Sequence, residues 1–381
     1  MSIAPLGLGE EVDRWRSSAR EFAQREILPR VADAESTETF PRELFEVAAQ
    51  AGLVGSHYPA DVGGGGGDLR SAMVIREEFS YLSVGISSGL GHQDHVGTAY
   101  LHRFGTAEQI ASWLRPALAG DVVIAMAITE PDAGSDVRRM RTTARRTDAG
   151  WTISGRKTFI TNGPIADVIA VAARIDGTDR FGVFLVRRTD VGFACERKFS
   201  KLGCRSSEVG ELVFDDVVTA DDRRLSPDGG SPLDDILDVL VVGRLLVAAS
   251  ALGLTRRAID LGLRRATSRR TFGQPIGRRQ EISMKFARAT TLLRSAELLA
   301  YHAAQLYART GTVPVLECSQ AKLFAAEVAV EVTDQMMRVF GGHGYLAESE
   351  IERLYRDARF FTIVEGTAEI QHRIIASRLG L

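Results

Sequence analysis

Residues 363–371 read I-V-E-G-T-A-E-I-Q and place Glu365 between a short apolar run and the start of a helix. Thr367 is a suitable N-cap, because apolar residues recur at helical spacing from Ile370 onward. Glu365 is therefore expected in a turn that is fixed on both sides. Partial burial would raise the pKa of its carboxyl group toward the value that a general base needs. Glu365 is our candidate catalytic base, although a lone Glu in a loop is more often only a surface residue.

Composition and charge favour a small molecule over a macromolecule as the ligand. The chain has 381 residues, 45% of them hydrophobic, with 47 Lys and Arg residues against 49 Asp and Glu residues. The balanced charge indicates neither a nucleic-acid surface nor a polybasic membrane anchor. The acidic N-terminus lacks the pattern of a signal peptide, and the three cysteines lack metal-binding or redox spacing. These features favour a cytoplasmic protein with reduced thiols.

Three kinds of periodicity divide the chain and predict an α+β fold. Residues 1–121 show helical periodicity and predict an N-terminal α-helical domain. Residues 122–232 contain short runs of β-branched and aromatic residues between turns, which predict a small central β-domain, a barrel or sandwich. Residues 233–381 contain long helical patterns at 236–266, 281–309 and 314–340 and a short last helix, which predict a C-terminal four-helix bundle. The apolar stretch 236–254 contains Asp238 and Arg244, so we interpret it as a buried helix and not as a membrane span.

Two features of the N-terminal domain suggest binding sites but lack a complete motif. The glycine run at residues 63–67 is followed by no Gly-Lys-Ser/Thr, so we expect a loop and not a phosphate site. His92, Asp94 and His95 form a polar cluster with no further ligand at a persuasive metal spacing. We predict no metal site, and expect the cluster to bond helix ends or to line a pocket.

Four segments after residue 121 carry the remaining chemistry. Residues 126–136, M-A-I-T-E-P-D-A-G-S-D, and residues 157–163, K-T-F-I-T-N-G, each join an apolar run to a turn with hydroxyl groups. Both suit a planar heteroaromatic ring with a polar edge. Residues 269–280, R-R-T-F-G-Q-P-I-G-R-R-Q, place arginines beside a glycine turn, which can bind a pyrophosphate. Residues 340–345, F-G-G-H-G-Y, allow another backbone or a cofactor to approach closely.

Together these segments resemble the signatures of the acyl-CoA dehydrogenase family of flavoproteins. The matching motifs are T-E-P-x-A-G-S-D at 129–136, K-x-F-I-T-N-G at 157–163, R-x-x-F-G-x-P-I at 269–276, G-G-x-G-Y at 341–345 and E-G-T-x-x-I-Q at 365–371. Each motif alone is weak, but five in the same order span essentially the whole chain. The resemblance implies the three-domain fold described above and FAD as the cofactor.

The resemblance also implies a role for each matching residue. It implies that Glu365 abstracts the α-proton of an acyl thioester while a hydride leaves the β-carbon for flavin N5. The residues it places against FAD are Met126, Ile128, Thr129, Ser135, Phe159, Thr161, Arg269, Phe272, Gln280, Arg338, Gly341, Gly342, Thr367 and Glu369. The residues it places against the substrate are Ser135, Arg244 and Gly366.

In such proteins the segment around Arg269, Phe272 and Gln280 reaches the FAD of a neighbouring subunit. The resemblance therefore implies a homo-oligomer, a tetramer or a dimer. It also implies an acyl-CoA substrate and an electron-transferring flavoprotein as the electron acceptor.

Three positions depart from the family pattern. Val364 replaces a Tyr that often precedes the catalytic Glu, and Arg338 stands where many members have Gln. Members acting on free CoA esters commonly carry Asp three residues before the arginine that matches Arg244, and this chain has Val241 there. An acyl group tethered to a carrier protein therefore stays open beside acyl-CoA.

Other interpretations stay open as well. An oxidase of the same fold would pass electrons to O2, and a scaffold protein would keep the fold without flavin. A nitroalkane-oxidising relative would be expected to carry Asp at the base position, so Glu365 speaks against it. If His92, Asp94 and His95 face the pocket, they favour a short or polar acyl group.

Overall fold

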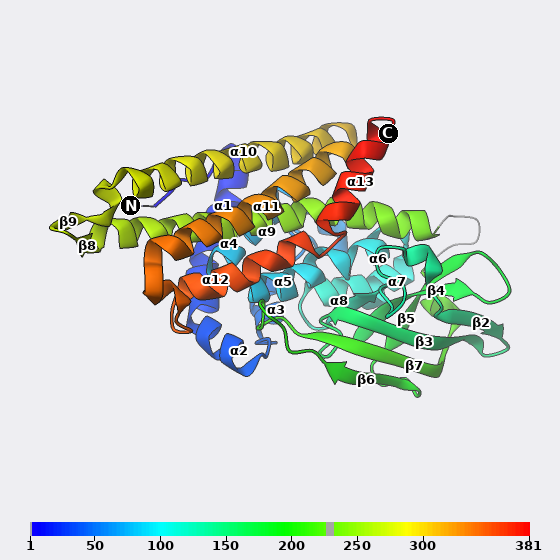
Figure 1. The fold of residues 1–381 in the computed structure, drawn as a ribbon. Coiled ribbons are helices and arrows are strands. Elements are labelled where there is room, and N and C mark those ends of the chain that lie inside the picture. The colour runs from blue at the N-terminus through cyan, green and yellow to red at the C-terminus, as the bar shows by residue number, and fades with distance from the viewer. Residues whose placement is uncertain (1, 226–231) are drawn as a thin grey trace.

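The computed structural model describes residues 2–225 and 232–381 of the chain (Figure 1). Long C-terminal helices run along the top of the view, the N-terminal helices lie beneath them, and a β-sheet fills the lower right. This is the three-part α+β arrangement that the sequence predicts. The proposed boundaries after residues 121 and 232 stay predictions.

The N-terminal part contains two helices of 13 and 14 residues, α1 and α4, and several shorter helices. Its helices are α1 Glu10–Phe22, α2 Val31–Thr37, α3 Leu44–Gln50, α4 Leu69–Leu82, α5 Val84–Gly91, the π-helix η4 His92–Val96, α6 Ala99–Phe104, α7 Ala107–Gln109 and α8 Arg115–Leu118. Asp68 begins α4, because its carboxylate accepts a hydrogen bond from the backbone N–H of Arg70 at 2.8 Å. Asp68 is thus the N-cap of α4.

The glycine run before α4 is an ordered loop. Its backbone N–H groups at Gly65 and Gly67 donate to the carbonyl oxygens of Gly55 and Ser56 at 3.0 and 2.9 Å. A Cβ at Gly64 would lie 2.3 Å from the backbone oxygen of Tyr58, so a side chain has no room there. These N–H groups are used within the chain, as expected of a loop and not of a phosphate site.

The β-domain is one curled sheet of seven strands. Its strands are β1 Ile124–Ala127, β2 Thr143–Thr147, β3 Gly150–Thr161, β4 Val168–Ile175, β5 Phe181–Arg187, β6 Phe193–Lys198 and β7 Val209–Thr219. The order is β1-β4-β2-β3-β7-β6, with β5 also paired to β4. β4 is parallel to β1 and β2, and the other pairs are antiparallel. The register of β3 against β7 shifts between Lys157 and Ile160, which turns Phe159 out of the regular strand.

The C-terminal part is a helix bundle built on α9. Its elements are α9 Pro232–Ser268, β8 Arg270–Thr271, β9 Gln274–Pro275, α10 Gln280–Thr310, α11 Val315–Phe340, α12 Glu350–Ala358, η10 Arg359–Thr362 and α13 Ala368–Arg378. The three predicted long helices are present, and their ends differ from the sequence prediction by a few residues. The sequence analysis missed α12, whose apolar residues Ile351, Leu354 and Ala358 are separated by charged ones.

Helix α9 is long and apolar enough to cross a membrane by length and composition alone. However, 83% of its most apolar window is buried within the protein, where it packs against α4, α10 and α11. The prediction of a buried core helix is confirmed. It places Gly243 and Arg244 beside the loop that carries Glu365.

Candidate active site

A cavity of about 510 Å³ lies where the helices meet the sheet. Its wall is formed by α4, α5 and η4, by β1 and the turn after it, by β3, α9 and η10, and by residues 363–370. The cavity brings together the sequence-predicted residues Met126, Ile128, Thr129, Ser135, Phe159, Thr161, Arg244, Glu365, Gly366 and Thr367. Segments more than 200 residues apart in the sequence thus share one site.

The backbone at Glu365 is held in a conformation that non-glycine residues rarely adopt. Its φ is 49°, in the left-handed region, and Gly366 follows with a φ of 90°. Such strain persists only where surrounding contacts determine it, and it concentrates at functional sites. The next residue, Thr367, caps α13 by accepting a hydrogen bond from the N–H of Ile370. The predicted N-cap is therefore confirmed.

Two side chains from neighbouring helices fix this loop by bonding its carbonyl groups. Lys322 of α11 donates from Nζ to the backbone oxygen of Gly366 at 2.7 Å. Gln371 of α13 is buried, and its Nε2 donates to the backbone oxygens of Glu365 and Gly366 at 3.2 and 2.9 Å. The loop is thus held from both sides, which orients Glu365 without using its carboxylate.

The carboxylate itself points to the cavity and has a buried oxygen. Oε2 of Glu365 is buried without a hydrogen-bond partner among the described residues. Burial raises the pKa of Glu365 to about 7, against the charges of Arg76, Arg244 and Lys322, which lower it. A carboxyl group with this pKa takes and releases a proton readily near neutral pH.

Helix α9 makes room for this carboxylate at a glycine. A Cβ on Gly243 would lie 2.2 Å from Glu365 Oε2, closer than any real contact allows. Its neighbour Arg244 is buried, and its Nη1 donates to the hydroxyl of Ser319 at 3.2 Å. The position of Glu365 thus depends on a residue about 120 positions earlier in the chain.

On the sheet side of the cavity, a buried ion pair connects the segment that contains Glu130 with the segment that contains Lys157. Lys157 Nζ lies 2.8 Å from Glu130 Oε1 and also donates to the backbone oxygen of Ile128 at 2.9 Å. The Glu130 carboxylate accepts from the backbone N–H groups of Arg141 and Thr142 at 2.6 and 3.0 Å. The two sequence segments that we expect to bind a flat ring are therefore locked together.

Phe159 stands on this wall with a side chain that the protein does not cover. It has a φ of 59°, is 65% exposed, and stacks against Phe199 at a centroid distance of 5.3 Å. The hydroxyl-bearing residues Thr129, Ser135 and Thr161 line the same cavity. An open aromatic face beside several hydroxyl groups fits a planar ring with polar edges.

Of the polar cluster His92, Asp94 and His95, one residue lines the cavity and the other two lie in the core. His92 lines the cavity, and its Nε2 accepts the backbone N–H of Met126 at 3.1 Å. Burial lowers the pKa of His92 to about 3, so the ring is neutral. Asp94 and His95 are buried behind it, bonded to the backbone of Gly55 and Val239. Only His92 thus bears on the polarity of the pocket.

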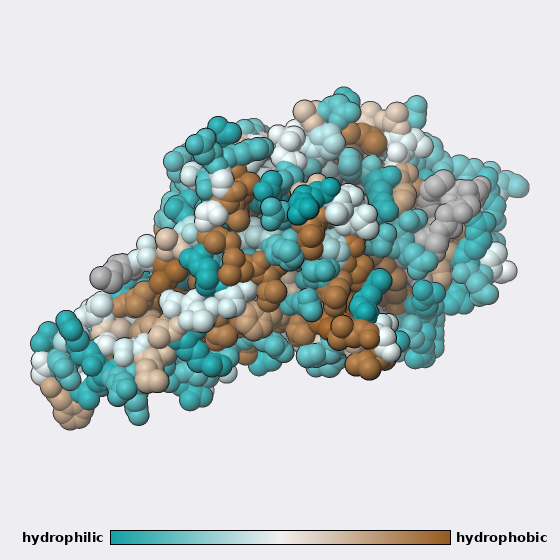
Figure 2. Space-filling model, turned by 90° about the horizontal axis from the view of Figure 1, so that it is seen from above, coloured by the Kyte–Doolittle hydropathy of each residue, from teal (hydrophilic) through white to brown (hydrophobic). Residues whose placement is uncertain are grey.

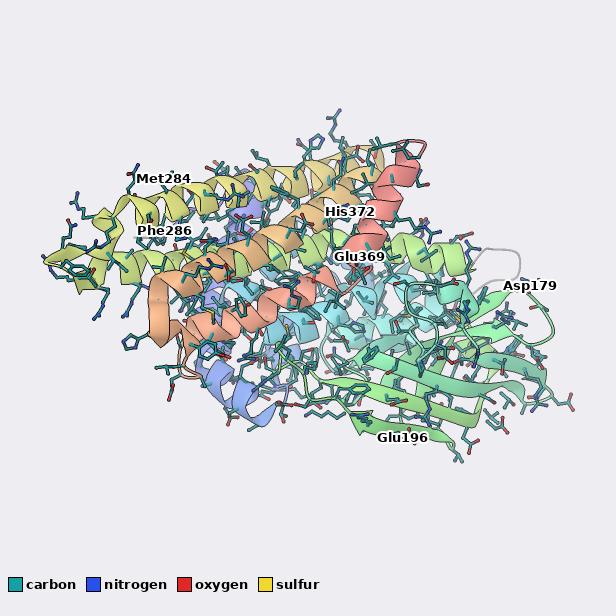
Figure 3. The ribbon with its side chains drawn as sticks, in the orientation of Figure 1. Asp179, Glu196, Met284, Phe286, Glu369 and His372 are labelled. Atoms are coloured by element: carbon teal, nitrogen blue, oxygen red, sulfur yellow. The ribbon has the colours of Figure 1, made fainter. Side chains whose placement is uncertain are left out.

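A second set of predicted residues lies far from the cavity. Arg269, Phe272, Gln280, Arg338, Gly341 and Gly342 are exposed around β8, β9 and the ends of α10 and α11. Figure 3 labels Met284, one turn beyond Gln280, near the left end of the bundle, whereas Glu369 lies in the first turn of α13, away from that end. Phe272 is 95% exposed and has a φ of 48°. Within one chain, these residues and Glu365 do not share a site.

Several residues of the site were missed by the sequence analysis. Arg76 and Gly243 reach it from helices, Lys322 and Gln371 hold its loop, and Glu130 fixes its sheet wall. Among residues 2–225 and 232–381, no group of three or more His, Cys, Asp or Glu side chains is arranged to hold a metal ion. Two carboxylates line the cavity: Glu130 is paired with Lys157, and Glu365 lies near several cations.

Comparison with known proteins places these observations in a family. The profiles of the N-terminal, middle and C-terminal domains of acyl-CoA dehydrogenases match residues 9–121, 125–217 and 233–380. A 3-(aryl)acrylate reductase from Clostridium sporogenes is 36% identical over 374 residues, covering 97% of this chain and 98% of its own. A benzylmalonyl-CoA dehydrogenase from Aromatoleum aromaticum is 35% identical over 359 residues, covering 94% and 95%.

Solved structures agree with these sequence matches. Butyryl-CoA dehydrogenase from Megasphaera elsdenii superposes with a TM-score of 0.94 at 29% identity, covering 99% of this chain and 100% of that one. A glutaryl-CoA dehydrogenase from Mycobacterium smegmatis in complex with FADH2 superposes with a TM-score of 0.92 at 29% identity, covering 98% and 95%. This chain therefore belongs to the acyl-CoA dehydrogenase family, whose members are FAD-dependent oxidoreductases acting on CH–CH groups.

Proposed function

We propose that this protein removes the α- and β-hydrogens of an acyl thioester and that Glu365 is the base. The observation that supports this most is the geometry of Glu365. Its left-handed backbone and its anchored loop aim a half-buried carboxylate into the cavity, and its buried Oε2 has no hydrogen-bond partner among the described residues. A positioned base of suitable pKa is what removal of a weakly acidic α-proton requires.

The residues present fit FAD on the sheet side of the cavity. Met126, Ile128, Thr129, Phe159 and Thr161 form a wall with apolar and hydroxyl-bearing parts, and the open face of Phe159 matches a flat ring. When bound there, FAD supplies the acceptor for the β-hydride. Ser135 and Thr367 would contact the cofactor at the edges of this wall, and Glu369 would do so beside the loop.

The substrate would lie between this wall and Glu365. Glu365 takes the α-proton, and its backbone N–H donates to the thioester oxygen as negative charge develops. Gly366 would border the thioester, and Arg244 would balance the charge of the carboxylate nearby. Leu237, Leu240 and Val247 of α9 line the cavity and exclude water from the reacting carbons.

We propose a homo-oligomer, a tetramer or a dimer, in which a neighbouring subunit completes the cofactor site. The exposed residues Arg269, Phe272, Gln280, Arg338, Gly341 and Gly342 would reach the pyrophosphate and adenosine of the neighbour's FAD. Figure 2 shows hydrophobic surface along the upper face of the bundle, where α10 exposes Met284 and Leu298 at 61% and 54%. Such a patch marks an interaction surface.

We propose coenzyme A as the carrier of the acyl group, an electron-transferring flavoprotein as the acceptor, and the cytoplasm as the location. The argument for a carrier-protein thioester is that Val241 stands where members acting on free CoA esters commonly carry Asp. Val241 is buried in the apolar core and is not part of the cavity wall. The family's activity on CoA esters therefore outweighs this one position.

The test is the visible spectrum of the purified protein under anaerobic conditions, before and after addition of acyl-CoA esters of different lengths. Bleaching of the flavin by one of them, but not in Glu365→Gln, supports the reaction and the base together. Bleaching by carrier-protein thioesters alone would contradict coenzyme A as the carrier. Rapid reoxidation by O2 would identify an oxidase, and a colourless protein that does not take up FAD would contradict the enzyme.

A further inference from the structure

Arg76 is a buried cation on the cavity wall, and no acid among the described residues forms an ion pair with it. Its side chain projects from α4, it is 8% exposed, and it lines the cavity with Ser88 and His92. Its Nη1 donates to the backbone oxygen of Ser87, while Nε is buried without a partner. Within the described ranges no carboxylate lies within ion-pair distance of it. A buried guanidinium without an acid is costly, so its presence calls for an explanation.

Other buried arginines that contact α4 show that the fold normally supplies such acids. Arg16 Nη1 lies 2.9 Å from Glu77 Oε1, and Arg256 Nη2 lies 2.7 Å from Glu78 Oε1. Glu77 and Glu78 directly follow Arg76 in the sequence, yet they do not line the cavity and they pair with other cations. Arg76 differs from these arginines because it faces the cavity.

Helix α5 is shaped to admit this guanidinium. A Cβ at Gly91 would lie 0.9 Å from Arg76 Nη1, so any larger residue at position 91 would displace the arginine. The φ of Gly91, −77°, is ordinary for a helix, so its backbone conformation does not require glycine. Space for Arg76 is therefore the structural reason for a glycine at this position.

The groups that face Arg76 leave the inner cavity positively charged. Asp94 and Glu365 act on it only from a distance, and Asp94 already accepts a hydrogen bond from the N–H of Gly55 at 2.6 Å. His92 is neutral. The negative charge of Glu365 interacts with Arg244 and Lys322 as well as with Arg76, so it cannot balance all three cations. A negatively charged ligand group would balance this excess charge.

We propose that Arg76 binds a carboxylate group on the acyl chain, so that the substrate is the thioester of a dicarboxylic acid. This inference rests on the proposed function and adds the substrate class. Arg76 offers planar N–H donors that suit a carboxylate, and Ser88 adds a hydroxyl group on the same wall. The simpler alternative is that Arg76 only balances the charge of Glu365, which would affect all acyl groups equally.

The test compares thioesters of equal carbon number that differ in a terminal carboxylate. The pairs are succinyl-CoA with butyryl-CoA, glutaryl-CoA with valeryl-CoA, and adipyl-CoA with hexanoyl-CoA. We expect the wild-type protein to prefer the carboxylate member of at least one pair by tenfold or more in kcat/KM. Arg76→Met should abolish that preference, because the charged hydrogen-bond partner of the carboxylate is lost.

Two further variants keep the result interpretable. Arg76→Lys keeps the charge without the fork of donors and should retain an intermediate preference. Arg20→Met removes a half-exposed arginine that pairs with Glu78 of α4 outside the cavity, and should leave the preference unchanged. If Arg76→Met does not fold, Arg76→Lys and Arg76→Gln provide the same comparison.

Binding without turnover gives a second readout. In the Glu365→Gln background, calorimetry should show tighter binding of the carboxylate ester and loss of this difference with Arg76→Met. A wild-type preference for the uncharged esters, or equal losses for both members of a pair, would overturn the inference. If no thioester of either kind reduces the flavin, the proposed function fails instead.

Discussion

Glu365 Oε2 occupies the space that a Cβ on Gly243 would need, at a distance of 2.2 Å. Gly243 belongs to α9 and Glu365 to the loop before α13, so the bundle itself sets where the carboxylate can lie. A methyl group at position 243 would push the carboxylate away from the substrate.

We therefore expect Gly243→Ala to lower kcat by about a hundredfold, because small displacements of a reacting group are expensive. The flavin should stay bound, since Gly243 does not belong to the sheet wall. Gly262→Ala is the matched control, because its Cβ would meet the side chains of Met336 and Phe286 at 2.4 and 3.1 Å, and neither of them lines the cavity. Stopped-flow reduction of the flavin measures both variants, and equal rates in Gly243→Ala and wild type would contradict this placement.

The raised pKa of Glu365 predicts a pH-dependent stability difference. Between the ordinary value of 4.5 and about 7, the folded protein holds a proton that the unfolded chain has lost. The proton on Glu365 therefore stabilises the folded protein at low pH. This stabilisation is lost as the pH rises from 4.5 through about 7, because the folded protein must then release the proton. Glu365→Gln should be more stable than wild type at pH 8, by on the order of 2 kcal/mol, and this advantage should shrink toward pH 4.5.

Urea unfolding at pH 5 and pH 8 measures this difference. The comparison is made between the two proteins at each pH, so that other titrating groups cancel. A constant stability difference across the two pH values would show that the pKa of Glu365 is not raised.

We expect Lys322 to lower the pH at which Glu365 becomes ionised and can act as a base. Its charge lowers the pKa of Glu365, and its Nζ also bonds the backbone oxygen of Gly366. Lys322→Met should move the midpoint of the pH–rate profile to higher pH, because one stabilising cation is lost. Gln371→Leu removes comparable hydrogen bonds to the loop without a change in charge, and should lower the rate while leaving the midpoint in place. A shift of the same size in both variants would contradict the electrostatic origin.

The Lys157–Glu130 pair should be essential for the sheet wall. Lys157→Met would leave the buried Glu130 carboxylate without its cation, which typically costs about 3–5 kcal/mol. We expect a lower unfolding free energy and weaker flavin binding, measured by urea unfolding and by the flavin content after dialysis. Arg156→Met, one residue earlier, breaks the ion pairs of an exposed guanidinium with Glu196 and the half-buried Glu211 and should change the unfolding free energy by less than about 1 kcal/mol. Similar losses in the two variants would contradict a special role for the buried pair.

Much of the fold and part of the site could be predicted because they depend on local sequence. Helix periodicity is enough to locate α9, α10 and α11, and Thr367 marks the start of α13 through its own capping side chain. Helix α12 was missed because it is short and mostly charged, although Ile351, Leu354 and Ala358 recur at helical spacing and face α11 and α9.

The remaining parts of the site depend on contacts between distant segments. Arg76 is followed by Glu77 and Glu78, and such a charged run usually marks the solvent side of a helix, so nothing local shows that Arg76 faces a cavity. Gly243 resembles any other glycine in a helix until Glu365 is placed beside it. The left-handed backbone of Glu365 and Phe159 likewise follows from tertiary contacts, since neither residue type favours it.

The central claim is that Glu365 takes the α-proton, and exchange of that proton with solvent tests it most directly. An acyl-CoA ester with sulfur in place of the β-carbon cannot lose a hydride from that position, so only proton transfer remains. Incubated in D2O with the FAD-bound protein, its α-position should gain deuterium, as followed by NMR. We predict that Glu365→Gln with equal flavin content slows this exchange by roughly a thousandfold or more. Equal exchange in the two proteins would show that another group removes the proton.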